Sequence, residues 1–124
     1  MSPKRSEFNI LVRKHLDDLK KSRRMTQEEL AERCGVGRVT IQVAGKRPRS
    51  LGYEPMLKLI DVLELSPKES SELQRAWLED RLSPGALGAA YMVAFNVLRT
   101  VLKPAELDDV VHRMIVAYNR ELAS

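Results

Sequence analysis

Hydrophobic positions recur along most of this chain at the three- and four-residue spacing of helices that are apolar on one side. The first stripe follows Ser6, a residue suited to capping a helix, and consists of Phe8, Leu11, Val12, His15, Leu16 and Leu19. This helix should end near residues 22–24. His15 lies on the edge of the stripe, where we expect a partly buried, hydrogen-bonded histidine in preference to a metal ligand.

Two short helices are predicted next, on either side of a glycine-containing turn. Thr26 and Glu29 have the spacing of a capping box, so a helix of about two turns should begin here and end at Gly35. Residues 38–44 form the second helix, although the β-branched residues among 39–43 would also suit a strand. Two short helices across a tight turn are typical of a helix-turn-helix, whose second helix lies in the DNA major groove.

Two longer helices should follow the turn motif. Pro55 suits the first turn of a helix whose inward residues are Met56, Leu57, Ile60 and Leu63. Ser66 and Glu69 form a second capping box, with a proline between them at the first helical position. The helix that begins there should run to about Arg81, with inward residues Leu73, Ala76 and Trp77.

Residues 83–124 are predicted to form a helical hairpin, with arms that begin at Ser83-Pro84 and at Pro104. The first arm is apolar on two faces: one consists of Leu87, Tyr91, Phe95, Leu98 and Leu102, the other of Ala86, Ala90, Val93, Val97 and Val101. The second arm has a single stripe, Leu107, Val110, Val111, Met114, Ile115, Tyr118 and Leu122. Because one arm covers one face of the other, the spare face should meet the N-terminal domain or a second subunit.

The residues around the turn resemble the lambda-repressor-like (Xre) family. The family pattern of T-Q-x-x-L-A, G-V, T-I, G-K and a proline is matched by Thr26, Gln27, Leu30, Ala31, Gly35, Val36, Thr40, Ile41, Gly45, Lys46 and Pro48. The likeness extends over roughly residues 8–81. It implies an all-α fold, in which a five-helix lambda-repressor-like DNA-binding domain over residues 1–82 precedes the hairpin at 83–124. Only three residues separate Ile41 from Gly45, fewer than in the family, so the recognition helix is short.

The resemblance also implies roles for individual side chains. Gln27 is expected to reach a phosphate, and Arg38, Val39 and Gln42 are expected to face base edges. Thr40 and Lys46 should contact the DNA backbone. With the basic residues that follow, the expected DNA-binding set is Gln27, Arg38, Val39, Thr40, Gln42, Lys46, Arg47 and Arg49. A second basic group precedes the capping box and could also meet phosphates: Lys20, Lys21, Arg23 and Arg24.

The distribution of charge agrees with a nucleic-acid partner. The net charge is +4 over 124 residues, but residues 1–50 hold 13 Lys and Arg against 6 Asp and Glu, a balance of +7. Residues 51–124 hold 8 against 11, a balance of −3. The basic half is the half with the turn motif, as binding to phosphates would require. The alternative is an ordinary protein whose basic residues cover solvated faces.

Other classes of function find little support in the sequence. The two histidines and the single cysteine are too dispersed for metal ligation or nucleophilic catalysis, and no glycine-rich phosphate loop is present, so we expect no enzyme and no cofactor. Cys34 falls on an apolar helix face, which predicts a buried thiol and a reducing, cytoplasmic setting. The basic N-terminus leads into no apolar segment, and the longest apolar run, residues 87–95, is too short to span a bilayer.

We therefore expect a cytoplasmic transcriptional regulator, a repressor that binds double-stranded DNA with a two-fold operator. The partner in that assembly would be a second copy, a homodimer formed through residues 83–124. The alternative is a protein-interaction module or an antitoxin that keeps the same fold, with a protein partner and with base readout weakened by the short recognition helix.

Overall fold

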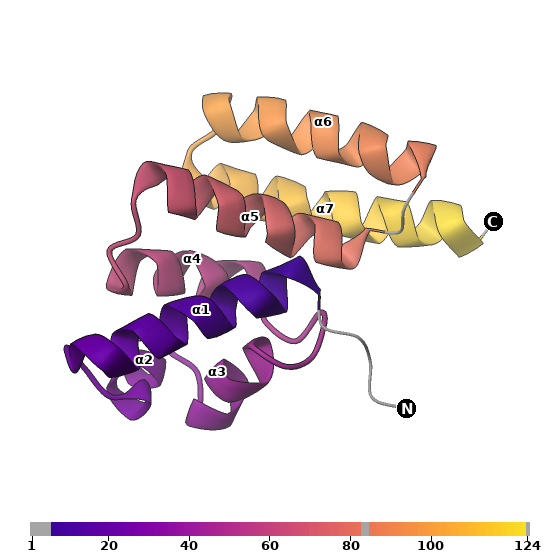
Figure 1. The fold of residues 1–124 in the computed structure, drawn as a ribbon. Coiled ribbons are helices and arrows are strands. Elements are labelled where there is room, and N and C mark those ends of the chain that lie inside the picture. Colours follow the sequence, from indigo (N-terminus) through magenta and orange to yellow (C-terminus); the bar gives the residue numbers. More distant parts are fainter. Residues whose placement is uncertain (1–5, 83–84, 124) are drawn as a thin grey trace. The chain divides into compact units, whose positions relative to one another are not determined.

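The computed structural model describes residues 6–82 and 85–123, and within these ranges the protein is all-helical, without strands. The predicted all-α class is therefore confirmed, and the strand alternative for residues 39–43 is wrong. The seven helices are α1 (Glu7–Ser22), α2 (Gln27–Cys34), α3 (Arg38–Ala44), α4 (Tyr53–Val62), α5 (Pro67–Arg81), α6 (Ala86–Val101) and α7 (Pro104–Ala123) (Figure 1).

The chain divides into two compact units, Met1–Asp80 and Arg81–Ser124. The first contains α1 to α4 and nearly all of α5, and the second contains α6 and α7. The predicted Ser83-Pro84 start of the hairpin lies outside the described residues, as does the basic segment 1–5. Helix α6 begins at Ala86, after Gly85 at its N-cap.

Local capping chemistry sets where the first helices begin. The Ser6 hydroxyl accepts a hydrogen bond from the Asn9 amide at 3.2 Å, and the Asn9 side chain accepts one from the Ser6 amide at 3.1 Å. The Thr26 hydroxyl likewise accepts from the Glu29 amide at 3.1 Å. The return bond predicted from Glu29 is wrong, because its carboxylate accepts from the Thr26 hydroxyl at 3.3 Å and not from the Thr26 amide. The Thr26 cap therefore satisfies one backbone amide at the start of α2, whereas a complete capping box satisfies two.

The start of α5 is a complete capping box, as predicted. The Glu69 amide donates to the Ser66 hydroxyl at 3.2 Å, and the Ser66 amide donates to the Glu69 carboxylate at 3.1 Å. These bonds from Ser66 also favour the charged carboxylate and lower the pKa of Glu69. The two reciprocal bonds hold α5 at the position that the sequence indicates.

The core of the first unit is apolar and centres on two aromatic rings. Tyr53 and Trp77 pack with ring centroids 5.0 Å apart, and the Trp77 indole donates a hydrogen bond to the Leu51 carbonyl at 2.8 Å. The other large side chains with less than 2% exposure in this unit are Phe8, Leu30, Ile41, Leu51, Met56, Leu59, Leu73 and Leu78. Trp77 is thus a core residue whose polar atom is satisfied.

The inward face of α4 differs from the predicted one. Met56 is fully buried as expected, but Leu57, Ile60 and Leu63 are only half-buried, and Tyr53 and Leu59 take the core positions. Helix α4 begins at Tyr53, so Pro55 lies in its first turn as predicted, and the helix packs against α2. Its buried row is therefore 53, 56 and 59, spaced by three residues along one face.

The second unit is an antiparallel pair of helices, α6 and α7 (Figure 1). Tyr91 and Tyr118 meet edge to face with centroids 5.4 Å apart, and Phe95 and Val111 are fully buried. The stripe predicted for α7 is buried or half-buried as far as Tyr118, but Leu122 is 52% exposed. Helix α7 has 20 residues against 16 in α6, so its last turn extends past its partner.

Across residues 6–82 and 85–123, no helix has the length and apolar character that a membrane span requires.

Candidate nucleic-acid interface

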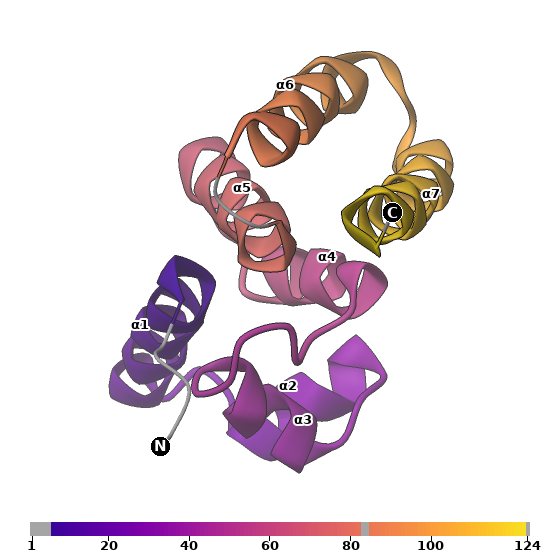
Figure 2. The same ribbon diagram turned by 90° about the vertical axis from the view of Figure 1, so that its right-hand side faces the viewer.

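The predicted turn motif is present as two short helices that pack against each other, α2 and α3 (Figure 2). Gly35 ends α2 with a φ of +72°, a left-handed conformation that glycine adopts without strain. The next amide, from Val36, donates back to the Ala31 carbonyl at 3.0 Å. The chain then turns through Gly37, which precedes α3 in an extended conformation. The turn residues predicted from the sequence therefore make the predicted turn.

Helix α3 is seven residues long and presents one face to the core and one to solvent. Ile41 and Ala44 are buried at 1% and 0% exposure. On the other side Arg38 is exposed and Val39 is 68% exposed, while Thr40 and Gln42 are half-buried. The predicted base-facing residues Arg38 and Val39 are thus accessible to a ligand.

The C-terminal end of α3 is held by hydrogen bonds from outside the motif. Asn9, fully buried on α1, donates from its side-chain amide to the Ala44 carbonyl at 2.7 Å and to the Arg47 carbonyl at 2.9 Å. The Ser50 hydroxyl also lies within hydrogen-bonding distance of the Arg47 carbonyl, at 2.8 Å. A helix this short has few internal hydrogen bonds, so these contacts from α1 and the following loop fix its position.

Sequence reasoning missed Asn9 as a positioning residue. The residue stands on the buried face of α1, in a stripe that is otherwise almost wholly apolar. Its spacing of three from Ser6 was the available signal, because a polar residue at this place can complete a capping box. A polar residue at an inward position also needs partners, since an unsatisfied buried amide is costly. The partners themselves could not be read from the sequence.

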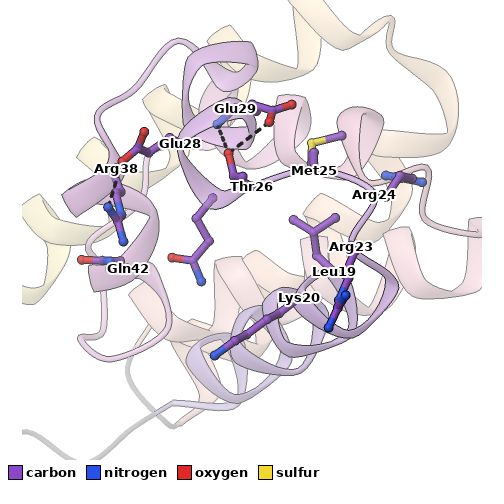
Figure 3. Close-up of a pocket in the computed structure, with 11 residues that line it drawn as sticks. Leu19, Lys20, Arg23, Arg24, Met25, Thr26, Glu28, Glu29, Arg38 and Gln42 are labelled. Atoms are coloured by element: carbon purple, nitrogen blue, oxygen red, sulfur yellow. Dashed lines mark hydrogen bonds and ion pairs between the residues drawn. The ribbon is translucent and has the colours of Figure 1, made fainter.

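A groove of about 700 Å³ opens between the end of α1, the start of α2 and the exposed face of α3. Figure 3 shows Lys20 and Arg23 on one side of the groove and Arg38 and Gln42 on the opposite side. Gln27, the first residue of α2, also lines it. The structure thus brings together three of the predicted DNA-binding residues, Gln27, Arg38 and Gln42, and adds basic side chains from α1.

Two carboxylates also line the groove, and one of them is paired with Arg38. The Arg38 guanidinium lies 2.9 Å from a Glu28 carboxylate oxygen, and the two side chains are 55% and 71% exposed. The second carboxylate, Glu29, faces the Thr26 cap. An ion pair this exposed contributes about 0–1 kcal/mol, so Arg38 can exchange Glu28 for another acceptor at little cost.

The other predicted DNA-binding residues lie outside the groove lining. Lys46 and Arg47 are exposed in the loop after α3. Arg49 has a φ of +61°, its amide donates to the Asp80 carboxylate at 2.8 Å, and its side chain donates to the Asp80 carbonyl at 3.2 Å. Arg49 is therefore held at the end of α5, and its guanidinium is engaged within the protein.

The four basic residues before the capping box also separate into different environments. Lys20 and Arg23 line the groove with Arg24. The Arg24 guanidinium, however, bonds the Glu64 carboxylate at 2.8 Å and the Val62 carbonyl at 2.9 Å, so it ties the start of the motif to the end of α4. Lys20 and Arg23 are the members of this group placed to meet a phosphate inside the groove.

Cys34 and His15 are buried groups on the inner faces of α2 and α1. Cys34 is 1% exposed, as predicted, and burial raises the pKa of its thiol. His15 is 7% exposed, more deeply buried than the predicted edge position, and desolvation lowers its pKa. In the part of the chain that the structure describes, no group of three His, Cys, Asp or Glu residues could hold a metal ion.

Comparisons of this chain with protein-family models, with curated proteins and with solved structures found no match.

Proposed function

We propose that this protein is a sequence-specific DNA-binding transcriptional regulator of the lambda-repressor-like type, and that it acts by binding, not by catalysis. The observation that carries the proposal is the groove, in which Gln27, Arg38 and Gln42 meet Lys20 and Arg23. Amide and guanidinium groups in one place suit base edges, and flanking basic side chains suit phosphates. The +7 balance of residues 1–50 supports the same partner.

The arrangement of α1 to α5 supports the proposed family type at the level of helix order. Five helices occupy residues 7–81, the second and third pack across a glycine turn, and α1 contacts α3. In a helix-turn-helix protein the second helix of the pair enters the major groove. We therefore assign α3 to the major groove and the N-terminus of α2 to the adjacent phosphate backbone.

Binding would require Arg38 to leave Glu28. Both side chains are more than half exposed, so the exchange costs little, and the guanidinium can then donate two bonds to the O6 and N7 atoms of a guanine. Gln42 lies one turn further along the same helix face and can pair with an adenine edge. Each contact would contribute about 1–3 kcal/mol of discrimination at its own base pair.

Selection of bound duplexes from a random pool by the purified protein tests the proposal. We expect an enriched sequence with two-fold symmetry, because a homodimer presents two identical recognition helices. Arg38→Ala and Gln42→Ala should each remove the preference at one base pair of a half-site. Lys46→Ala is the matched control: loss of a phosphate contact weakens binding to all sequences alike. A pool without any enriched sequence would contradict base readout.

The second candidate is a protein-interaction module or an antitoxin on the same scaffold. The observation that favours it is the state of α3, which is seven residues long and has its leading arginine paired within the protein. A co-purifying small protein, together with DNA binding that lacks sequence preference, would select this candidate over the first.

A further inference from the structure

Helix α6 has an exposed face without charge. The helix is 16 residues long, and Arg99 is its only charged residue. Val93, Val97 and Val101 are 64%, 59% and 70% exposed. The outer face of a surface helix usually carries charged or polar residues. A continuous apolar face of this kind instead marks an interaction site.

The exposed valines lie on one narrow strip of the helix. At about 100° per residue, Ala86, Ala90, Val93, Val97 and Val101 fall within an arc of roughly 80°. Arg99 lies on the other side, where its guanidinium stands 5.9 Å from the centre of the buried Phe95 ring. The strip therefore faces away from the buried side of α6, and we call these five residues the valine face.

We propose that the valine face packs against the valine face of a second copy of this chain, with the two α6 helices antiparallel across a two-fold axis. In a two-fold contact each surface meets an identical surface, so any charge near the axis would meet its own copy. A face with no charge avoids that repulsion. It also offers nothing to DNA or to a charged peptide.

The sizes of the side chains select the antiparallel arrangement. The first half of the face consists of alanines and the second half of valines. In antiparallel packing Ala86 lies opposite the partner's Val101, Ala90 lies opposite the partner's Val97, and Val93 lies beside the axis. Small residues then meet large ones toward both ends of the helix. Parallel packing would place valine on valine at one end and alanine on alanine at the other, which leaves a gap.

The expected assembly is a reversible dimer. The face runs the length of α6, about 24 Å at 1.5 Å per residue. One pair of helices makes a small interface, so we expect dissociation in the micromolar range and not a permanent dimer. This inference specifies the homodimer of the proposed function and does not rest on DNA binding.

The molar mass of the protein in light scattering tests the valine face. At high micromolar concentration we expect the wild type at twice 14.1 kDa and Val97→Glu at 14.1 kDa. The matched control is Val116→Glu on α7, since Val116 is 57% exposed against 59% for Val97. It should remain dimeric. Helix content by circular dichroism should be unchanged in both variants, because neither position is buried.

Three other outcomes of the light-scattering experiment would each overturn part of the proposal. A dimeric Val97→Glu variant would overturn the valine face and leave the homodimer in place. A monomeric wild type would overturn both the face and the homodimer, while the selection of duplexes would still decide DNA binding. A Val116→Glu variant as monomeric as Val97→Glu would show that the contact is not specific to α6.

Cysteine cross-linking tests the direction of the helices. Val93→Cys should form a dimer disulfide by itself under mild oxidation, because this position meets its copy beside the axis. Ala86→Cys and Val101→Cys should each remain uncross-linked alone and form a disulfide when the two variants are mixed. Self-cross-linking of Ala86→Cys would overturn the antiparallel arrangement. The native Cys34 is 1% exposed, so it should not cross-link, and the wild-type protein under the same oxidation is the control for this.

Discussion

Helices α3 and α6 both leave valines in solvent, but their surroundings are different. Val39 on α3 is 68% exposed, and the residue before it, Arg38, lines a groove with Lys20 and Arg23. Helix α6 exposes three valines, each one turn after the last, and that face has no charged residue. One exposed valine in a polar setting is ordinary for a protein surface, whereas an uninterrupted apolar face is not.

The neighbours of an exposed side chain therefore indicate its partner better than its own exposure does. Basic and amide groups around Val39 suit a polyanion with hydrogen-bonding edges. Alanines and valines alone on α6 suit another apolar surface. The end of α3 is also held by hydrogen bonds from residues outside the helix, Asn9 and Ser50. Helix α6 is more than twice as long as α3.

The largest expected effect is that of salt, which should weaken DNA binding at the groove but not dimerisation through the valine face. With about four phosphates neutralised by each subunit, the affinity of one subunit for its half-site should fall roughly a hundredfold between about 50 and about 200 mM salt, and the affinity of a dimer for the whole operator should fall by roughly the square of that factor. The basic residues counted here are Lys20, Arg23, Lys46 and Arg47. The dimer should be unaffected or slightly tighter, because apolar contacts are not screened. Fluorescence anisotropy of a labelled operator and light scattering over one salt series measure both. A dimer that dissociates in salt would contradict an apolar α6 interface.

The starts of α1, α2 and α5 and the end of α2 were predictable because they depend on local chemistry. Ser6, Thr26 and Ser66 cap helices within three residues of themselves, and Gly35 ends α2 through its own backbone conformation. Such signals need no knowledge of the tertiary structure. The two faces of the first hairpin arm were predictable for the same reason, since the spacing along one helix decides which residues share a side.

The details of the candidate site were not predictable, because they depend on contacts between distant residues. Arg49 is held by Asp80, 31 residues away, and Asn9 reaches Ala44 across 35 residues. Whether a surface arginine points at a ligand or at a neighbouring carboxylate depends on packing that the order of residues does not state. The pairing of Arg38 with Glu28 belongs to the same class.

A substitution at Asn9 should have the next largest effect, and it should act within the first unit, on the end of α3 and on the cap of α1. Asn9→Ala would leave the Ala44 carbonyl without the Asn9 amide and the Arg47 carbonyl with the Ser50 hydroxyl alone, at a cost of about 1–3 kcal/mol in unfolding free energy. Asn9→Asp keeps the shape but presents a carboxylate to the same two carbonyls, so it should cost more. Urea denaturation measures both. DNA affinity should fall with stability while the dimer mass is unchanged; an Asn9→Asp variant as stable as the wild type would contradict the role of the donor.

The smallest expected effect is a pH dependence that also belongs to the first unit. The two buried polar residues among those described, Asn9 and His15, both lie on α1. Desolvation lowers the pKa of His15 below 6.5, against the opposing influence of the nearby Glu69 carboxylate; Lys14 lowers it further, and Asp18 and Glu72 raise it.

Because the native pKa lies below the unfolded one, the unfolded chain binds a proton first as the pH falls. The first unit should therefore be most stable above about pH 6.5, and stability should decrease as the pH falls through that value toward the lower native pKa. Chemical denaturation at pH 7.5, 6.5 and 5.5 measures the slope, and His15→Leu should reduce it because the titrating group is removed. His112→Gln on α7 is the control for loss of a histidine that is exposed. If His15→Leu kept the full wild-type slope, the pH dependence of stability would come from titration of carboxylates and not of His15. Asn9 would then be the one buried polar residue of α1 that affects the stability of the first unit.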